Sequence, residues 1–222
     1  LNDCSPNVSL LLPRMLSVAP RVIIKTSPML DATAAAKELP NVKEIYTIGT
    51  ATECKELMLV CERGYYSTPE LHAVTLTKDN VDHVVFSDLS TYAHTYVSEL
   101  EPGQFLYEPY PAVMKSGRFN DIASKYDVHM LSCDTHIFTS NIYSDNFPGK
   151  QMRILYAAPY NKRTIKYIKN EYSKVNVTTR GFIQSAPDLA KSIGIAQGGN
   201  LMLYGVGLSG KRNYWLAVCE II

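Results

Sequence analysis

The stretch Arg21-Val22-Ile23-Ile24-Lys25 is the part of the sequence that most constrains the fold. Its centre is apolar and β-branched, which is typical of a strand buried on both faces of a parallel sheet. The turn Thr26-Ser27-Pro28 follows, and a helix is predicted over residues 29–39, ending before Pro40. The chain therefore begins with an alternating α/β pattern.

The segments around this stretch predict the closing half of a doubly wound sheet. A helix is predicted after Ser5-Pro6, and two longer strands, residues 42–50 and 54–62, can form an antiparallel hairpin. A helix, a buried strand, a second helix and an antiparallel pair end many such sheets. Because the hairpin supplies only one neighbour to the buried strand, we expect preceding strands or self-association to cover its other edge.

The remaining sequence predicts two α+β modules. After short strands at 71–77 and 83–86, the polar stretch 88–102 reads as a connector or an exposed helix. A strand at 105–107, a helix opened by Pro111 and three further strands then indicate a ferredoxin-like module. The last module has a helix over 161–173, a strand over 175–179, a capping box at Ser185-Ala186-Pro187-Asp188 and a closing hairpin. The expected domains are residues 1–95, 96–150 and 151–222.

Composition sets broad limits on function. Lys and Arg number 22 against 21 Asp and Glu, so a net charge of +1 argues neither for nor against nucleic acid. No apolar run reaches the ~18 residues of a membrane span, and the first residues do not resemble a signal peptide. Five scattered cysteines without a Cys-x-x-Cys pair favour reduced thiols, so we expect a cytoplasmic protein without membrane contact.

Three polar residues follow the first buried strand, where ligands bind in doubly wound sheets. Lys25, Ser27 and Asp31 could line a substrate pocket there. The alternative is a turn that starts a helix, with Ser27 as the cap and Pro28 at the first helical position. That alternative needs no ligand to explain it.

The sequence lacks the usual signatures of cofactor and metal binding. It has no Gly-x-Gly-x-x-Gly after a strand and no Walker loop, so cofactor binding by this chain alone is unsupported. His129, Cys133 and His136 are close enough to suggest a metal, but zinc needs a fourth ligand or an open catalytic position. We therefore assign no metal site.

A basic segment between Tyr160 and Arg180 is the strongest physical sign of a partner. Its helix places lysines on one face and Ile165, Ile168 and Tyr172 on the other. Such a patch is typical of a surface that binds the phosphate backbone of a nucleic acid, although an ordinary solvated lysine face explains it equally well. The candidate RNA-binding residues are Lys162, Arg163, Lys166, Lys169, Lys174 and Arg180.

Several short motifs occur in an order that resembles a known family. They are Asp3-Cys4-Ser5-Pro6, Lys25-Thr26-Ser27-Pro28-Met29-Leu30-Asp31, Glu53-Cys54-Lys55-Glu56-Leu57, Leu106-Tyr107-Glu108-Pro109, Thr135-His136-Ile137-Phe138-Thr139-Ser140 and Phe147-Pro148-Gly149. Together with the tail over 176–200, they resemble bacterial class I S-adenosylmethionine-dependent methyltransferases with a ferredoxin-like module and a THUMP-like carboxy-terminal domain. Two positions depart from that pattern: Arg180-Gly181-Phe182-Ile183 stands where the family usually reads Arg-Asn-Phe-Pro, and Asn200 where it commonly has an acid.

The resemblance implies both a fold and a function. Residues 1 to about 62 would end a Rossmann-like methyltransferase sheet, and the strands that hold S-adenosylmethionine would lie upstream. The cofactor is thus expected in the full-length protein and not in this chain alone. RNA, either tRNA or rRNA, is the expected substrate by analogy with other THUMP domains.

Two further interpretations compete with an RNA methyltransferase. The chain could be a non-enzymatic RNA-binding module that uses the basic segment. It could also be an inactive fragment that lacks the cofactor-binding half.

Overall fold

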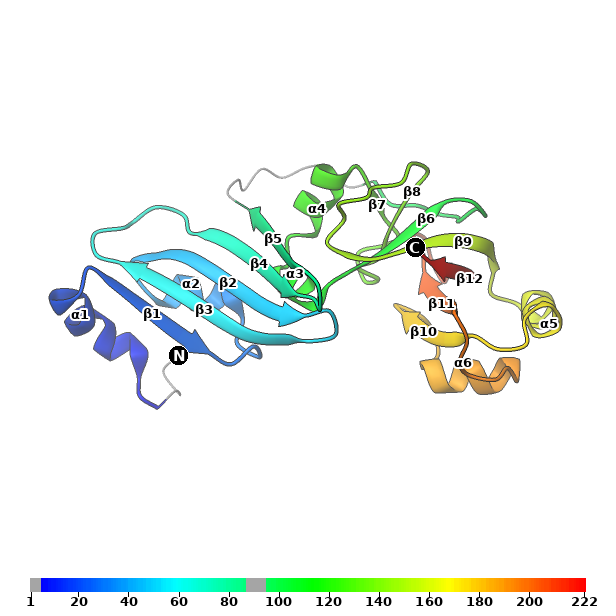
Figure 1. Cartoon of the computed structure of the whole chain (residues 1–222), viewed down its shortest axis with the longest axis horizontal. Helices are drawn as coiled ribbons and strands as arrows, with labels where there is room; N and C mark the ends of the chain where they lie inside the picture. Colours follow the sequence, from blue (N-terminus) through cyan, green and yellow to red (C-terminus); the bar gives the residue numbers. More distant parts are fainter. Residues whose placement is uncertain (1–4, 87–94) are drawn as a thin grey trace. The chain divides into compact units, whose positions relative to one another are not determined.

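The computed structural model describes residues 5–86 and 95–222, and the chain forms two compact units. The first unit holds the described residues up to 86 together with Tyr110–Arg118. The second holds residues 95–109 and Phe119–Ile222. Each unit is built on one β-sheet with helices beside it, so the chain has the expected mixed α/β and α+β character (Figure 1).

The first unit has a five-stranded sheet in the order β1-β3-β2-β4-β5. Its strands are β1 (Arg21–Thr26), β2 (Val42–Thr50), β3 (Cys54–Glu62), β4 (Glu70–Leu76) and β5 (Val81–Phe86). The predicted hairpin of β2 and β3 is confirmed, while β2 and β4 run parallel. Mixed pairing of this kind is common at the end of a doubly wound sheet.

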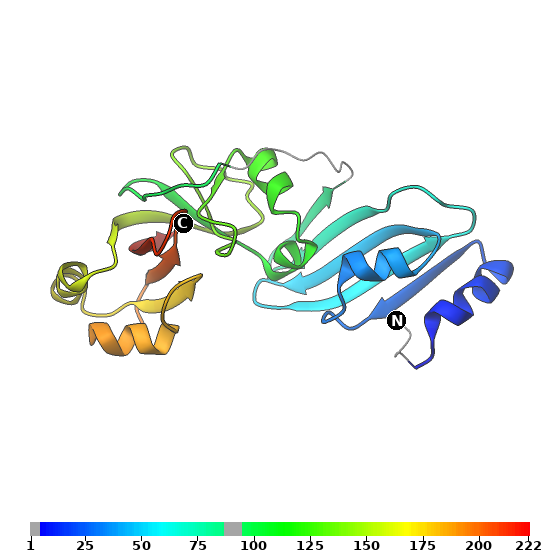
Figure 2. The ribbon, with the colours of Figure 1, turned by 180° about the vertical axis from the view of Figure 1, so that it is seen from behind.

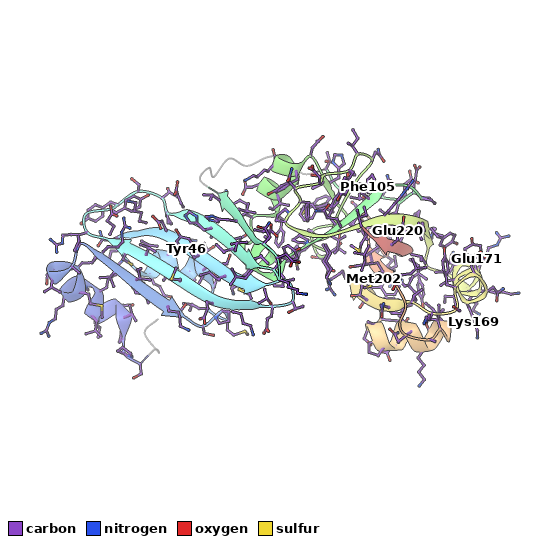
Figure 3. All side chains as sticks on the ribbon, viewed as in Figure 1. Tyr46, Phe105, Lys169, Glu171, Met202 and Glu220 are labelled. Carbon is purple, nitrogen blue, oxygen red and sulfur yellow. The ribbon has the colours of Figure 1, made fainter. Side chains whose placement is uncertain are left out.

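Helices cover one face of this sheet. Figure 2 shows α2 (Ala32–Glu38) and α3 (Pro111–Ser116) on that face, while α1 (Val8–Val18) packs beside β1. Thr47 lies on the covered face and is buried, and its hydroxyl donates to the carbonyl of Ala112 at 2.8 Å. The opposite face carries Tyr46, and no helix of the described part of this unit covers it (Figure 3).

The prediction that β1 is a parallel strand buried on both faces is wrong. Ile24 is buried, but Ile23 is 61% exposed, and β1 pairs antiparallel with β3. The reason is that β3 lies between β1 and β2, so the two parallel strands are not direct neighbours. Within the described residues, β1 pairs with β3 alone. The sequence predicted one open edge, because the hairpin could supply only one neighbouring strand.

Two predicted helices differ from those observed. The helix expected from residue 29 begins at Ala32, because the carboxylate of Asp31 accepts from the Ala34 amide at 2.7 Å and caps the helix there. The helix opened by Pro111 is interrupted at Gly117, whose φ of 68° is left-handed. Gly117 therefore separates α3 from α4 (Phe119–Tyr126), and α4 belongs to the second unit.

The second unit has a seven-stranded sheet in the order β10-β11-β12-β9-β6-β8-β7. Its strands are β6 (Phe105–Pro109), β7 (His129–Met130), β8 (Phe138–Ser140), β9 (Gly149–Pro159), β10 (Asn176–Arg180), β11 (Leu201–Gly207) and β12 (Tyr214–Ile221). The first half of β9 pairs with β6, and its second half pairs with β12. One long strand thus connects the two ends of the unit.

Each face of this sheet has its own core. One core contains Leu106, Ile154 and Val206. The other packs the strands against α5 (Lys162–Glu171) and α6 (Ala186–Ile193) and includes Ile168 and Leu189. The apolar stripe predicted for α5 is confirmed, because Ile165 and Tyr172 pack against this core beside Ile168.

The local signals at the ends of the last elements are also confirmed. The hydroxyl of Ser185 accepts from the Asp188 amide at 3.3 Å, as a capping box predicts, and Gly194 ends α6 with a φ of 68°. β11 and β12 form the expected antiparallel hairpin.

The predicted connector falls partly outside the described residues, which omit 87–94. Residues 95–102 contain no helix, and Leu100 is buried in the core. The domain limits near residues 95 and 150 stay predictions. In the described part of the chain, no helix combines the length and the apolar character needed to cross a membrane.

Candidate nucleic-acid interface

Helix α5 presents a cationic face because its start and its apolar stripe fix its orientation. The side chain of Asn161 accepts from the amides of Arg163 and Thr164 at 2.9 and 3.0 Å, which caps the helix. Thr164 and Ile168 are buried against the sheet. The opposite side of the helix is exposed, and Figure 3 shows Lys169 and Glu171 at its last turn.

Three cations of α5 are free to meet a ligand. Lys162, Arg163 and Lys166 are exposed, and within residues 5–86 and 95–222 their side chains form no ion pair. Their charge is thus uncompensated by near neighbours, and it lies on one rigid element. A phosphate backbone is attracted to such a surface through counterion release.

The next two cations of the segment are partly engaged. The ammonium of Lys169 lies beside Gly194, where an added Cβ would come 3.2 Å from Nζ. Gly194 ends α6, and a cation is favoured at a helix carboxyl end. The side chain of Lys174 packs along Gly199.

The sixth cation, Arg180, lies on the other face of the sheet. Its guanidinium donates to the carboxylate of Glu108 and also to the carbonyl of Thr179 at 2.9 Å. The Tyr204 hydroxyl donates to the same carboxylate at 2.7 Å, and the ammonium of Lys150 lies 3.6 Å from it. Burial, followed by the negative charge of Glu108, raises the pKa of Tyr204, so its hydroxyl stays a donor. The structure therefore does not place all six predicted RNA-binding residues on one surface.

The three predicted pocket residues are all engaged locally. The ammonium of Lys25 pairs with Glu56 at 2.8 Å, Ser27 accepts from the Met29 amide at 3.2 Å, and Asp31 caps α2. Capping thus comes from Asp31, and Ser27 stabilises the turn before it.

The histidines and the cysteine considered for a metal do not converge. His129 Nδ1 lies 2.7 Å from the hydroxyl of Thr95, whereas His136 stacks on Phe119 with ring centroids 4.0 Å apart. Burial lowers the pKa of His136. Among the residues that the structure describes, no group of three or more His, Cys, Asp or Glu side chains could hold a metal ion.

A side-chain cluster that the sequence did not predict lies on the open face of the first sheet. Tyr46 stacks on His72 with centroids 4.3 Å apart, and His72 Nδ1 lies 3.0 Å from His83 Nε2. Burial, and then the charge of His83, lowers the pKa of His72. Histidines on two adjacent short strands were the available signal, but their register could not be read from the sequence.

The pairing of Glu108 with Arg180 was also not predicted from the sequence. The two residues belong to the motifs Leu106-Tyr107-Glu108-Pro109 and Arg180-Gly181-Phe182-Ile183. An acidic residue between buried strand residues was a sign that it needs a partner.

Comparisons with known proteins support this domain composition. Residues 105–148 match a ferredoxin-like domain model, and residues 149–220 match a THUMP domain-like model. The fold is also that of a crystal structure described as a "putative methyltransferase" from Porphyromonas gingivalis W83, with a TM-score of 0.91 and 23% identity. The match covers 99% of this chain and 56% of that one. None of the curated proteins compared with the chain matches it.

Proposed function

We propose that this chain is the carboxy-terminal part of an S-adenosylmethionine-dependent RNA methyltransferase and that it binds RNA through α5. The observation that carries the proposal is the exposed set Lys162, Arg163 and Lys166, which lies on a helix of the THUMP-like segment. The fold shared with the methyltransferase-named crystal structure supports the enzymatic context.

In this proposal the first unit completes a catalytic sheet. β1 has a free edge within the described residues, and strands of an upstream methyltransferase half would pair with it. Those strands would hold the methyl donor. Calorimetry on the longer protein is expected to show S-adenosylmethionine binding, and its absence there would contradict the enzymatic part of the proposal.

RNA binding is tested by reversing two charges on α5. The double variant Lys162→Glu/Lys166→Glu is expected to weaken binding of a single-stranded RNA, measured by fluorescence anisotropy. The plot of log K against log salt concentration has a negative slope, and each lost phosphate contact makes it shallower by about 0.7. The slope of the double variant is therefore expected to be shallower by roughly 1.4. The matched control Lys37→Glu/Lys78→Glu changes the same net charge at exposed positions of the first unit.

An unchanged affinity and slope in the α5 variant would overturn the RNA-binding proposal. RNA binding without S-adenosylmethionine binding by the longer protein would favour the second candidate function, a non-enzymatic RNA-binding module. That candidate depends on the same exposed cations and requires nothing of the open edge of β1.

A further inference from the structure

A cavity of about 260 Å³ lies in the second unit, away from α5. Its walls come from the segment before β6, from the loop after β7, from the residue after β10 and from the turn between β11 and β12. The residues that line it include Tyr96, Ser132, Cys133, Asp134, Arg212 and Tyr214. Pockets for drug-sized molecules span roughly 300–1,000 Å³, so this one suits a smaller ligand.

The cavity is held in shape by contacts between its walls. The hydroxyls of Ser132 and Thr135 donate to the carbonyl of Gly207 at 3.2 and 2.8 Å. Gly207 also approaches Gly181 so closely that an added Cβ would lie 2.4 Å from the Gly181 carbonyl oxygen. The Asn213 amide donates to the carbonyl of Ser98 at 2.7 Å and anchors the turn. These contacts join four separate segments, so the cavity exists before any ligand binds.

The lining combines the groups that recognise a nucleotide. Tyr96 and Tyr214 supply aromatic rings, on which bases stack. Asp134 supplies acceptor oxygens for base edges, and the Ser132 hydroxyl, whose proton is donated to Gly207, can act as a further acceptor. The guanidinium of Arg212 is exposed at the hairpin tip and forms no ion pair within the described part of the chain, so it is available to a phosphate.

We infer that this cavity binds one unpaired nucleotide of an RNA strand, with the base in the cavity and the phosphate at Arg212. The inference rests on the proposed RNA-binding function and adds a second contact to α5. Sequence-specific RNA recognition usually targets bases splayed out of single strands, whose faces and edges are accessible. A base within a duplex could not enter a cavity of this size.

Cys133 provides a direct reporter of occupancy. It lines the cavity and is exposed, whereas Cys61 and Cys219 are buried. Cys4 lies outside the described residues and Cys54 is half-buried, so both are replaced by Ser in the background protein. The rate of Cys133 alkylation by iodoacetamide then reports access to the cavity.

The experiment compares alkylation without RNA, with a mixed-sequence single-stranded RNA and with the same sequence as a duplex. The single strand is expected to slow alkylation several-fold at saturation, and the duplex is expected to leave the rate unchanged. Tyr214→Leu is expected to weaken single-strand binding by roughly 5- to 100-fold, the range for loss of one stacked base. Because Tyr214 packs on Phe182, Arg212→Met at the exposed tip serves as the variant that preserves folding. Its control is Lys211→Met, the adjacent exposed residue.

The outcomes separate this inference from the proposed function. If RNA binds α5 in a salt-dependent way but does not slow the alkylation of Cys133, the inference that the cavity binds a nucleotide is wrong, and the proposed function still stands. Equal protection by the duplex, or equal effects of Arg212→Met and Lys211→Met on single-strand affinity, would also overturn it. If the unmodified protein binds no RNA, both the cavity inference and the proposed RNA-binding function are wrong.

Discussion

The guanidinium of Arg180 on β10 donates to the carboxylate of Glu108 on β6, although three strands of the same sheet lie between them. Neighbouring strands are about 4.8 Å apart, so a flat sheet would separate β10 from β6 by roughly 19 Å. The contact therefore requires the sheet to curl, so that β10 and β6 approach each other across the core of Leu106 and Val206. This ion pair also joins the ferredoxin-like segment to the THUMP-like segment.

Loss of the Glu108 carboxylate is expected to destabilise the second unit. Glu108→Gln removes the charge that Arg180 and Tyr204 contact, and a buried polar group left without its partner costs about 1–3 kcal/mol. Urea denaturation measures the free energy of unfolding. Lys150→Met is the control, because Lys150 is half-exposed and its ammonium lies 3.6 Å from the carboxylate, beyond ordinary hydrogen-bond distance, so a smaller loss is expected. Equal losses in both variants would contradict this role of Glu108.

Arg180 is expected to contribute less to RNA affinity than Lys162. Its charge is offset by Glu108, whereas Lys162 forms no ion pair within the described residues. Arg180→Met should therefore leave the salt slope of RNA binding nearly unchanged, while Lys162→Met should reduce it by about 0.7. The salt dependence of fluorescence anisotropy distinguishes the two. A larger effect from Arg180→Met would place RNA on the face of the sheet that carries Glu108.

The pKa of His72 predicts how stability depends on pH. Burial lowers this pKa below its ordinary value of 6.5, so the folded chain resists a proton that the unfolded chain accepts. Above pH 6.5, His72 is neutral in both states and adds no pH dependence to the free energy of unfolding. As the pH falls from 6.5 through the folded pKa, the unfolded chain binds a proton first and the free energy of unfolding decreases. His72→Phe keeps a ring beside Tyr46 and should flatten this dependence in urea denaturation between pH 7 and 5 (about the range in which histidine titrates). An unaltered dependence in the variant would show that other groups cause it.

The cap of α5 is expected to stabilise the helix that carries the cationic face. Asn161→Ala removes the acceptor for the amides of Arg163 and Thr164, and loss of such a cap costs about 1 kcal/mol. Asn170→Ala on the exposed side of the same helix is the matched control and should be neutral or slightly stabilising. Thermal unfolding followed by circular dichroism tests both. A cap variant as stable as the control would contradict the prediction.

Local sequence signals predicted the helices and strands well where the stabilising group lies within a few residues of the element that it stabilises. The capping box at Ser185, the left-handed Gly194 and the apolar stripe of α5 depend on residues within one turn or one helix. The strands β2 and β3 could be predicted equally well from the sequence, because each has a long apolar run and a short polar turn joins them. In such cases the nearest residues in sequence decide the structure.

Long-range pairing could not be predicted in the same way. The apolar run of β1 indicated a strand, but its composition could not show that β3 lies between it and β2. Likewise, Arg180 was grouped with the lysines of α5 because of its position in the sequence. Only the alternation of β10 and the curl of the sheet place it on the opposite face, beside Glu108.

Strand β9 has a consequence for how this protein could be divided or recombined. The boundary between the two matched segments falls at its first residue, Gly149, yet its first half completes the sheet of the preceding segment. A cut there would leave β6 without one of its two hydrogen-bonded neighbours. The two segments are thus expected to be exchanged between proteins only as a pair, since neither retains a complete sheet without the other.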